Sequence, residues 1–412
     1  MQVGERALRH PALLAQTRPD QTRPDQTRAV LSVATGDHSL HAERPDETAV
    51  LVVPRRPDMP QWGSGPPLRP AASTRAFRPC LLPIIRGRAG VGGDPMVRYG
   101  PGAAPISVGA LLHLRRRRMS MLRHTTRLRQ LLNDPGILVA PGAYDGTGAR
   151  LVSQLGFQAF YLSGFETAAS ILGQPDVGYL SHTQMVERVT AMADVVDLPL
   201  IADADTGFGN PLNVRRAVIA YERAGAAAMH IEDQTFPKRC GHMLGREVVP
   251  VQEMVQKIKA AVDARQDPDF VIIARTDART AHGLDEAIDR GAAYHEAGAD
   301  MLFIESPESE EEMRRICEAF RGIVPLLSNQ IEGGRTPTSG VGVLQDMGYA
   351  LAIFPVGTAF AAAKGMRDYL EVLATAGDTR GVLGNLIQFE EFTALIGLGE
   401  HTELDRRYQS EQ

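Results

Sequence analysis

Ala226-Ala-Ala-Met-His-Ile-Glu-Asp-Gln-Thr-Phe-Pro-Lys-Arg-Cys-Gly-His242 joins a short apolar run to a dense group of polar side chains. The apolar residues 226–229 predict a buried strand. His230 and Glu232 stand two residues apart, so in a strand their side chains point to the same side. The cations, the cysteine and the last histidine follow on a loop, in which Gly241 gives the backbone the freedom that a hinge needs. The stretch therefore predicts a strand that ends in a chemically active loop.

The same pattern recurs throughout residues 119–412. Short apolar runs alternate with amphipathic segments, which indicates parallel strands covered by helices. Eight such units over roughly 240 residues match a (β/α)8 TIM-type barrel. The alternative, a doubly wound open sheet, more naturally has five or six strands. The predicted strands are residues 137–141, 159–163, 198–204, 227–232, 270–276, 301–305, 324–329 and 351–355, and the predicted helices include 183–196, 213–224, 251–264, 284–297 and 309–320.

Polar residues cluster where seven of these eight strands end. In a barrel these ends share one face, which is the face that hosts active sites. Solvated loops alone do not explain such a distribution, so we expect an enzyme. The residues concerned are Asp145, Ser163, Asp203, Asp205, Glu232, Asp233, Arg275, Asp277, Glu305 and Asn329.

Helical patterns continue beyond the last predicted strand, over residues 357–376, 379–396 and 401–412. One barrel needs fewer helices than this to close. Surplus helices of this kind cap the barrel or pack on a neighbouring subunit, so the sequence predicts an oligomer.

Residues 1–118 differ in composition from the rest of the chain. They hold eighteen Arg, no Lys and nine acidic residues, which gives a charge of +9, whereas residues 119–412 carry −14. Proline and glycine recur, and a five-residue polar unit repeats within residues 16–28. Such composition buries too little apolar surface to offset chain entropy. We expect a disordered extension, or a start assigned too far upstream with Met119 or Met121 as the true beginning, followed by a catalytic domain over residues 119–412.

The broad composition narrows the location and the partners. Three cysteines without a paired framework favour a reducing compartment. No run of about 18 apolar residues or signal-peptide core is present, so we expect a cytoplasmic protein without a membrane partner. The arginine run at residues 115–118 lacks interleaved aromatic residues, which argues against nucleic-acid binding.

Carboxylates dominate the predicted mouth of the barrel. Asp203 and Asp205 have the spacing that points two oxygen ligands to one side of a strand, as do His230 and Glu232. Oxygen ligands favour Mg²⁺ or Mn²⁺ over Zn²⁺. The competing interpretation of the two aspartates is helix capping and loop hydrogen bonding.

Cys240 is the most distinctive single residue. Lys238 and Arg239 precede it and His242 follows, and neighbouring cations lower the pKa of a thiol. We expect general acid work from this thiol, with a nucleophilic role beside His242 as the alternative. Cys317, in an apolar helical pattern, is instead expected to be a small buried side chain.

These residues resemble the isocitrate lyase/phosphoenolpyruvate mutase superfamily, and the resemblance covers about residues 122–410. The motifs that carry it occur in the same order as in the family. They are Tyr161-Leu-Ser-Gly164, Asp203-Ala-Asp-Thr-Gly207, His230-Ile-Glu-Asp-Gln234, Lys238-Arg-Cys-Gly-His242, Ile273-Ala-Arg-Thr-Asp277, Glu305 and Asn329-Gln-Ile-Glu-Gly-Gly-Arg-Thr-Pro337. The resemblance implies a (β/α)8 barrel with a helix swapped between subunits, a homotetramer, and Mg²⁺ (with Mn²⁺ as the alternative). It also implies a small carboxylate substrate that reacts through an enolate.

The resemblance also implies roles for individual residues. Asp203 resembles the direct metal ligand, while Asp176, Asp205 and Glu232 resemble acids that reach the metal through water. Cys240 resembles the acid that protonates the enolate after carbon–carbon cleavage, on a loop that closes over the substrate. The implied catalytic group is Cys240, Lys238, Arg239, His242 and Glu232. The implied substrate contacts are Tyr161, Ser163, Gly164, Phe165, Gly241, His242, Arg275, Glu305 and Asn329.

Departures from the family narrow the substrate. Methylisocitrate lyases resemble this chain but carry an arginine in place of Phe360 and another near Phe389. A third substrate carboxylate would therefore lie beside apolar rings, at a cost of several kcal/mol. We expect a Mg²⁺-dependent carbon–carbon lyase that cleaves a substituted malate or (methyl)isocitrate-like 2-hydroxy acid to a keto acid and a carboxylate through an enolate, and among these substrates we favour a malate of the 2,3-dimethylmalate kind. The alternatives are a carboxyvinyl-carboxyphosphonate phosphorylmutase-like enzyme, which shares the Lys238–His242 loop, an oxaloacetate hydrolase, and least of all a barrel that binds without catalysis.

Overall fold

The computed structural model describes residues 96–97, 106–107, 122–243 and 245–409. Two short strands, β1 (Met96–Val97) and β2 (Ile106–Ser107), pair with each other antiparallel. The other residues of the predicted disordered extension lie outside the described ranges.

Eight parallel strands form the central sheet, in the order β8-β7-β6-β5-β4-β3-β10-β9. The backbone N–H of Leu302 donates to the carbonyl of Pro325 at 3.0 Å, and a parallel bridge links Leu302 with Leu326. These contacts join β8 to the segment before β9, so the two edges of the sheet meet. The predicted (β/α)8 barrel is confirmed, and every predicted strand is present. The strands are β3 (Leu138–Ala143), β4 (Phe160–Leu162), β5 (Leu200–Asp203), β6 (Ala228–Glu232), β7 (Val271–Thr276), β8 (Met301–Ile304), β9 (Leu327–Asn329) and β10 (Leu351–Phe354).

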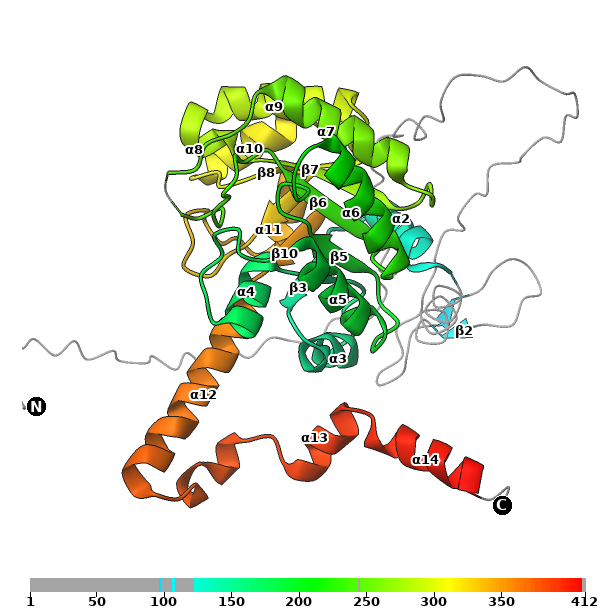
Figure 1. The fold of residues 1–412 in the computed structure, drawn as a ribbon, viewed down its shortest axis with the longest axis vertical. Coiled ribbons are helices and arrows are strands. Elements are labelled where there is room, and N and C mark those ends of the chain that lie inside the picture. Colours follow the sequence, from blue (N-terminus) through cyan, green and yellow to red (C-terminus); the bar gives the residue numbers. More distant parts are fainter. Residues whose placement is uncertain (1–95, 98–105, 108–121, 244, 410–412) are drawn as a thin grey trace, which may run out of the picture. The chain divides into compact units, whose positions relative to one another are not determined.

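Helices surround these strands, as Figure 1 shows. The five helices predicted over residues 183–320 are all present, with ends that differ by three residues at most. Several begin at a capping side chain; Ser181, for example, accepts from the backbone N–H of Gln184. The helices are α2 (His124–Asn133), α3 (Gly146–Gln154), α4 (Gly164–Leu172), α5 (His182–Ala193), α6 (Pro211–Arg223), α7 (Val251–Ala264), α8 (Ala278–His282), α9 (Leu284–Glu296), α10 (Glu310–Ala319) and α11 (Val341–Met347).

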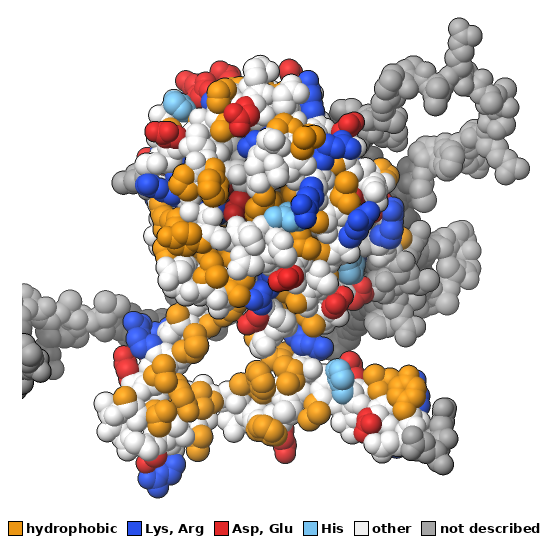
Figure 2. Space-filling view, viewed as in Figure 1, with side chains coloured by type: hydrophobic (Ala, Val, Ile, Leu, Met, Phe, Trp, Pro, Cys, Tyr) orange, Lys and Arg blue, Asp and Glu red, His pale blue; other side chains and the backbone are white. Residues whose placement is uncertain are grey.

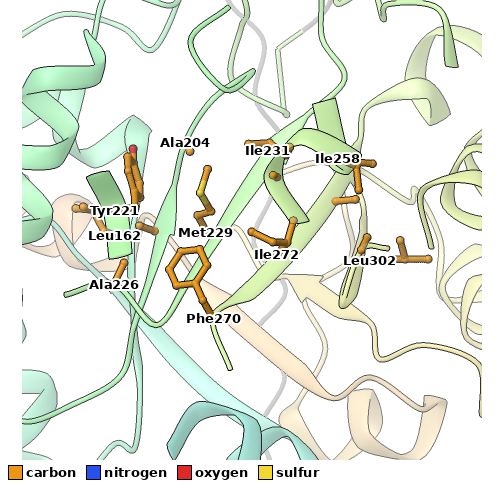
Figure 3. Packing of buried hydrophobic residues seen from close by; sticks show 14 of the residues in the cluster. Leu162, Ala204, Tyr221, Ala226, Met229, Ile231, Ile258, Phe270, Ile272 and Leu302 are labelled. Carbon is orange, nitrogen blue, oxygen red and sulfur yellow. The ribbon is translucent and has the colours of Figure 1, made fainter. Parts of the chain in front are cut away.

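The core has two layers because side chains alternate along each strand. Met229 and Ile231 of β6 belong to the outer layer, where strands meet helices such as α7, which contributes Ile258 (Figure 3). The inner layer fills the barrel and includes Ala228 of β6, together with Leu128 of α2. Because Met229 and Ile231 face outward, their neighbours His230 and Glu232 face the barrel interior. This alternation places the polar residues of β6 inside the mouth.

The C-terminal helices leave large apolar side chains exposed. They are α12 (Gly357–Ala376), the 3-10 helix η1 (Arg380–Asn385), α13 (Phe389–Leu395) and α14 (Leu398–Gln409). No residue of α12, α13 or α14 is buried, and Met366, Leu370, Phe389 and Tyr408 are each more than half exposed. Figure 2 shows hydrophobic side chains on the surface of these helices. The helical pattern predicted over residues 379–396 forms two short helices, η1 and then α13. An exposed apolar face of this kind suits a partner surface.

Within the described ranges, none of the helices combines the length and the apolar character needed to cross a membrane. The cytoplasmic location stays a prediction from the sequence.

Candidate active site

A small pocket with a volume of about 30 Å³ lies at the carboxyl ends of the strands. Twelve of the residues predicted for the site line it: Tyr161, Ser163, Phe165, Asp176, Asp203, Glu232, Lys238, Arg239, Cys240, Gly241, Arg275 and Asn329. The other four predicted residues, Gly164, Asp205, His242 and Glu305, contact members of this group. The structure thus brings the whole predicted set together.

Asp203 ends β5 and is held by backbone donors. Its Oδ2 accepts from the N–H of Gly164 at 3.0 Å, and its Oδ1 accepts from the N–H of Asp205 at 2.9 Å. Burial raises the pKa of Asp203, but His230 and Lys238 outweigh that effect and bring it to about 2. Asp203 is therefore an anion at neutral pH. The N–H of Gly164, expected in the substrate cradle, here serves this carboxylate.

Asp205 reaches the same pocket by a different route from the one predicted. The strand ends at Asp203, and Asp205 adopts a left-handed backbone conformation with φ of 47°. This region is uncommon for residues other than glycine, and aspartate is among those that tolerate it. The turn, rather than strand alternation, carries the Asp205 side chain back toward Asp203. Burial raises the pKa of Asp205 to about 7 although Lys238 opposes the shift.

Lys238 bridges two carboxylates instead of serving Cys240. Its Nζ lies 2.5 Å from Asp176 Oδ1 and 2.6 Å from Asp205 Oδ1, and the side chain is buried. Arg239 is exposed, and its backbone N–H and C=O are both bound by the side chain of Gln234. Lys238 is thus paired with carboxylates and not with the thiol. The prediction that the two cations lower the pKa of Cys240 is wrong, since burial raises it to about 11.

The loop that carries Cys240 is closed over the pocket. The N–H of Cys240 donates to the carbonyl of Asp176 at 3.1 Å, and the Ser306 hydroxyl donates to the carbonyl of Gly241 at 2.7 Å. A Cβ at residue 241 would lie 2.4 Å from Arg275 Nη2, so only glycine allows this approach. Ser306 and Gln234 hold the loop and were missed from the sequence. Only their places next to Glu305 and Asp233 could have drawn attention to them.

Glu305 gathers three of the predicted substrate contacts. Asn329 Nδ2 donates to its Oε2 at 3.1 Å, Arg275 Nη1 lies 3.6 Å from the same oxygen, and His242 Nε2 lies 3.1 Å from its Oε1. Burial raises the pKa of Glu305, but Arg275 and His242 outweigh it and hold the pKa well below its usual value. His242 Nδ1 accepts from the backbone N–H of Arg335 at 2.8 Å. Nδ1 is thus used as an acceptor, and Nε2 lies near Glu305 without a hydrogen bond of good geometry in the described part of the chain.

Glu232 and His230 line the inner wall of β6. His230 Nε2 lies 2.5 Å from the Tyr161 hydroxyl and 3.4 Å from Asp203 Oδ1. Burial lowers the pKa of His230 to about 4, so the imidazole is neutral. Glu232 Oε2 lies 3.3 Å from Arg275 Nε, whereas its Oε1 is buried with no hydrogen-bond partner in the described part of the chain. Burial raises the pKa of Glu232 well above its usual value.

The donor set fits a hard divalent cation that keeps several waters. In residues 122–243 and 245–409, no three His, Cys, Asp or Glu side chains form a ready-made ligand set. Asp203 nevertheless offers an ionised carboxylate, and the unpartnered Glu232 Oε1 lines the same pocket. Mg²⁺ commonly binds one or two carboxylates directly and others through water. Asp203 would hold such an ion, with Glu232, Asp176 and Asp205 around its waters.

A closed parallel barrel with carboxylates and a loop thiol at its mouth has the arrangement of an enzyme active site. The family model described as phosphoenolpyruvate phosphomutase matches residues 128–374. The chain belongs to this family, within the phosphoenolpyruvate mutase/isocitrate lyase superfamily.

Two curated relatives represent the family's range. The chain is 50% identical over 282 residues to 2,3-dimethylmalate lyase of Eubacterium barkeri, which covers 68% of this chain and 97% of the relative. It is 41% identical over 289 residues to the chloroplastic carboxyvinyl-carboxyphosphonate phosphorylmutase of Arabidopsis thaliana, covering 69% of this chain and 85% of the relative.

Solved structures agree with the fold. Oxaloacetate acetylhydrolase in complex with 3,3-difluorooxalacetate is 37% identical, with a TM-score of 0.67, and covers 70% of this chain and 97% of that one. Phosphonopyruvate hydrolase in complex with oxalate and Mg²⁺ is 34% identical, with a TM-score of 0.64, and covers 70% of this chain and 100% of that one.

Proposed function

We propose that the chain is a Mg²⁺-dependent carbon–carbon lyase that cleaves a substituted malate of the 2,3-dimethylmalate class to a 2-keto acid and a carboxylate. The observation that carries the proposal is the position of Cys240, a half-buried side chain that lines one pocket with Asp203 and Glu232. The 50% identity to a 2,3-dimethylmalate lyase supports it.

In the proposed reaction the 2-hydroxyl of the substrate gives its proton to an ionised carboxylate of the site, and the C2–C3 bond breaks. The hydroxyl carbon becomes the carbonyl of the keto acid, and the bonding electrons pass to C3, whose carboxylate becomes an enolate. The Cys240 thiol then delivers its proton to C3. A pKa of about 11 keeps this thiol protonated at neutral pH, which suits a general acid.

Mg²⁺ bound through Asp203 would stabilise the negative charge that develops on substrate oxygens. Asp176, Asp205 and Glu232 are proposed to orient its waters. Ser163, Gly164 and Phe165 are proposed to cradle one substrate carboxylate, with Tyr161, Arg275, Asn329, Glu305 and the Gly241–His242 peptide as further contacts. Lys238, Arg239 and His242 are proposed to hold the loop and its charges while it is closed.

The apolar wall of the site favours malates over tricarboxylates. The ring of Phe360 packs edge-on against that of Phe165, with their centroids 6.2 Å apart, and Phe165 lines the pocket. A third carboxylate placed beside Phe165 would lie against an apolar ring without a charged partner, which disfavours it. Phe360 is 46% exposed and backs this ring from outside the pocket lining. Phe389, the second position considered, lies on α13 and is 82% exposed, so it takes no part in the pocket of its own chain.

A substrate panel tests the proposal. Keto acid release would be followed with 2,3-dimethylmalate, malate, methylisocitrate and oxaloacetate, with Mg²⁺ and with chelator. We expect turnover of the substituted malate that depends on the metal and is lost in Cys240→Ser, while Mg²⁺ binding is retained. Equal activity on the tricarboxylate would contradict the assignment of Phe360.

A phosphorylmutase or an oxaloacetate hydrolase is the second candidate. The 41% identity to the carboxyvinyl-carboxyphosphonate phosphorylmutase favours the former, and the likeness to oxaloacetate acetylhydrolase favours the latter. Oxalate release from oxaloacetate, without cleavage of any malate, would decide for the hydrolase. Transfer between phosphorus and carbon in a phosphonate substrate would decide for the mutase.

We propose a homotetramer in which α12, α13 and α14 pack on a partner subunit. The exposed apolar side chains of these helices support this assembly. Light scattering should give the mass of four chains, and Phe389→Asp should lower that mass. A monomer in solution would contradict the proposal.

A further inference from the structure

Glu166 is a buried carboxylate outside the proposed chemistry. It lies in the first turn of α4 with no exposed surface. Its Oε1 accepts from the Thr358 hydroxyl at 2.8 Å and from the backbone N–H of Ala359 at 3.0 Å. Thr358 and Ala359 form the first turn of α12, so Glu166 ties the start of one helix to the start of another.

Burying a carboxylate at this contact carries a free-energy penalty. Burial raises the pKa of Glu166 to about 7, and the nearby acids Glu332 and Asp145 add to the shift. Its other oxygen, Oε2, is buried with no hydrogen-bond partner in the described part of the chain. An apolar side chain would fill the same space without that penalty. What the carboxylate supplies is a directed pair of hydrogen bonds.

The neighbouring residues show where the direction matters. Phe165 precedes Glu166, and Phe360 follows Ala359, so the hydrogen-bonded pair and the aromatic pair lie side by side on α4 and α12. The two rings meet edge-on at an interplanar angle of 85°. The Thr358 hydroxyl also lies 3.0 Å from the carbonyl of Gly142 at the end of β3, which fixes the same turn to the barrel. Movement of α12 at this point would move Phe360 against Phe165.

We propose that Glu166 is a positioning residue for substrate selectivity. By holding the first turn of α12, it keeps Phe360 packed against Phe165, the ring that lines the pocket, so that Phe165 is placed to accept an alkyl group at C3 of the 2-hydroxy acid. This inference rests on the proposed function, since it concerns which malate the site selects. Glu166 itself does not touch the reacting atoms.

Two substitutions at residue 166 separate the effect of its hydrogen bonds from the effect of the space that its side chain occupies. The amide oxygen of Glu166→Gln accepts both hydrogen bonds, whereas Glu166→Ala accepts neither. Thr358→Val, which keeps the shape but loses the hydroxyl, is a milder second variant in case Glu166→Ala fails to fold. Ser309→Ala, which removes the cap of α10 away from the pocket, is the matched control for loss of a helix cap.

The readout is the preference for 2,3-dimethylmalate over malate, measured as the ratio of kcat/KM values. Binding of both acids with Mg²⁺ is measured in parallel by calorimetry in a Cys240→Ser background. We expect Glu166→Ala to lower the ratio about tenfold, chiefly through KM for the alkylated acid, because about 1.4 kcal/mol of hydrogen bonding corresponds to tenfold. Thr358→Val should lower it less. Glu166→Gln and Ser309→Ala should keep it within about threefold.

The outcomes distinguish the two levels of inference. Equal losses on both acids in Glu166→Ala and Thr358→Val, or a Gln variant no better than Ala, would overturn the positioning role. Wild-type protein that binds the two acids with the expected preference but cleaves neither would refute the lyase while leaving Glu166 its role. Absence of any binding preference in the wild type would overturn both.

Discussion

Lys238 Nζ lies 2.6 Å from Asp205 Oδ1 and 2.5 Å from Asp176 Oδ1, so one buried ammonium group is shared by two buried carboxylates from different loops. Because Lys238 and Cys240 share a loop, this bridge holds the thiol over the pocket. Burial raises the pKa of Asp205 to about 7 even beside the lysine. Without Lys238, the charged form of Asp205 would be less stable still.

Replacing this lysine should open the loop. In Lys238→Met, Asp176 and Asp205 lose their cation, and breaking a buried pair from one side typically costs about 3–5 kcal/mol. We expect kcat to fall by about 100-fold or more and the thermal midpoint to drop. Lys259→Met, on the exposed side of α7, is the control and should change neither quantity. Full activity in Lys238→Met would contradict the role of the bridge.

The Cys240 thiol should be slow to react at neutral pH. Its pKa is raised by burial to about 11, and only the thiolate is a nucleophile. At pH 8 we expect alkylation by iodoacetamide on the order of 100-fold slower than for a thiol of ordinary pKa, with a rate that climbs toward pH 11. Mass spectrometry locates the label, and Cys240→Ser gives the background from Cys80 and Cys317. Fast labelling of Cys240 at pH 7 would show that the cations control the thiol after all.

The sequence allowed the barrel and the membership of the site to be predicted. The apolar runs specify strands because parallel strands are buried on both faces, and the polar residue after each run falls at the mouth because parallel strands end together. His230 and Glu232 illustrate this, since alternation with Met229 and Ile231 alone places them inside.

The contacts made by those residues were beyond sequence reasoning. Lys238 stands two positions from Cys240 but binds Asp176, which lies in a distant loop. Asp205 enters the pocket through a left-handed turn, which spacing does not reveal. The Glu166–Thr358 hydrogen bond joins residues 192 positions apart. Each depends on which loops meet in space, and in a barrel that is set by the closed ring rather than by local pattern.

The turn at Gly334 should set the position of the His242 ring, which lies at the end of the loop that carries Cys240. A Cβ at residue 334 would lie 2.6 Å from His242 Nδ1, and φ at this glycine is not in the left-handed region, so the main effect of Gly334→Ala is on the imidazole. Displacing the ring breaks its bond to the N–H of Arg335 and moves Nε2 from Glu305. We expect a 10- to 100-fold fall in kcat/KM, roughly 1.4–2.8 kcal/mol, and faster alkylation of Cys240. Gly342→Ala, where a Cβ has nothing within 4 Å, should behave as wild type.

The stability of the protein should depend on pH through Glu166. Its pKa is raised by burial from 4.5 to about 7, so the folded state binds this proton more tightly than the unfolded state. The contribution is fully present below about pH 4.5 and is lost as pH rises through 7. Glutamine carries no charge at any pH. Between pH 5 and pH 8, the free energy of unfolding of Glu166→Gln should therefore rise relative to that of wild type by on the order of 3 kcal/mol. Urea unfolding at several pH values measures the difference, and Glu187→Gln, exposed on α5, is the control. A difference between Glu166→Gln and wild type that stays constant with pH would mean that this carboxyl titrates normally.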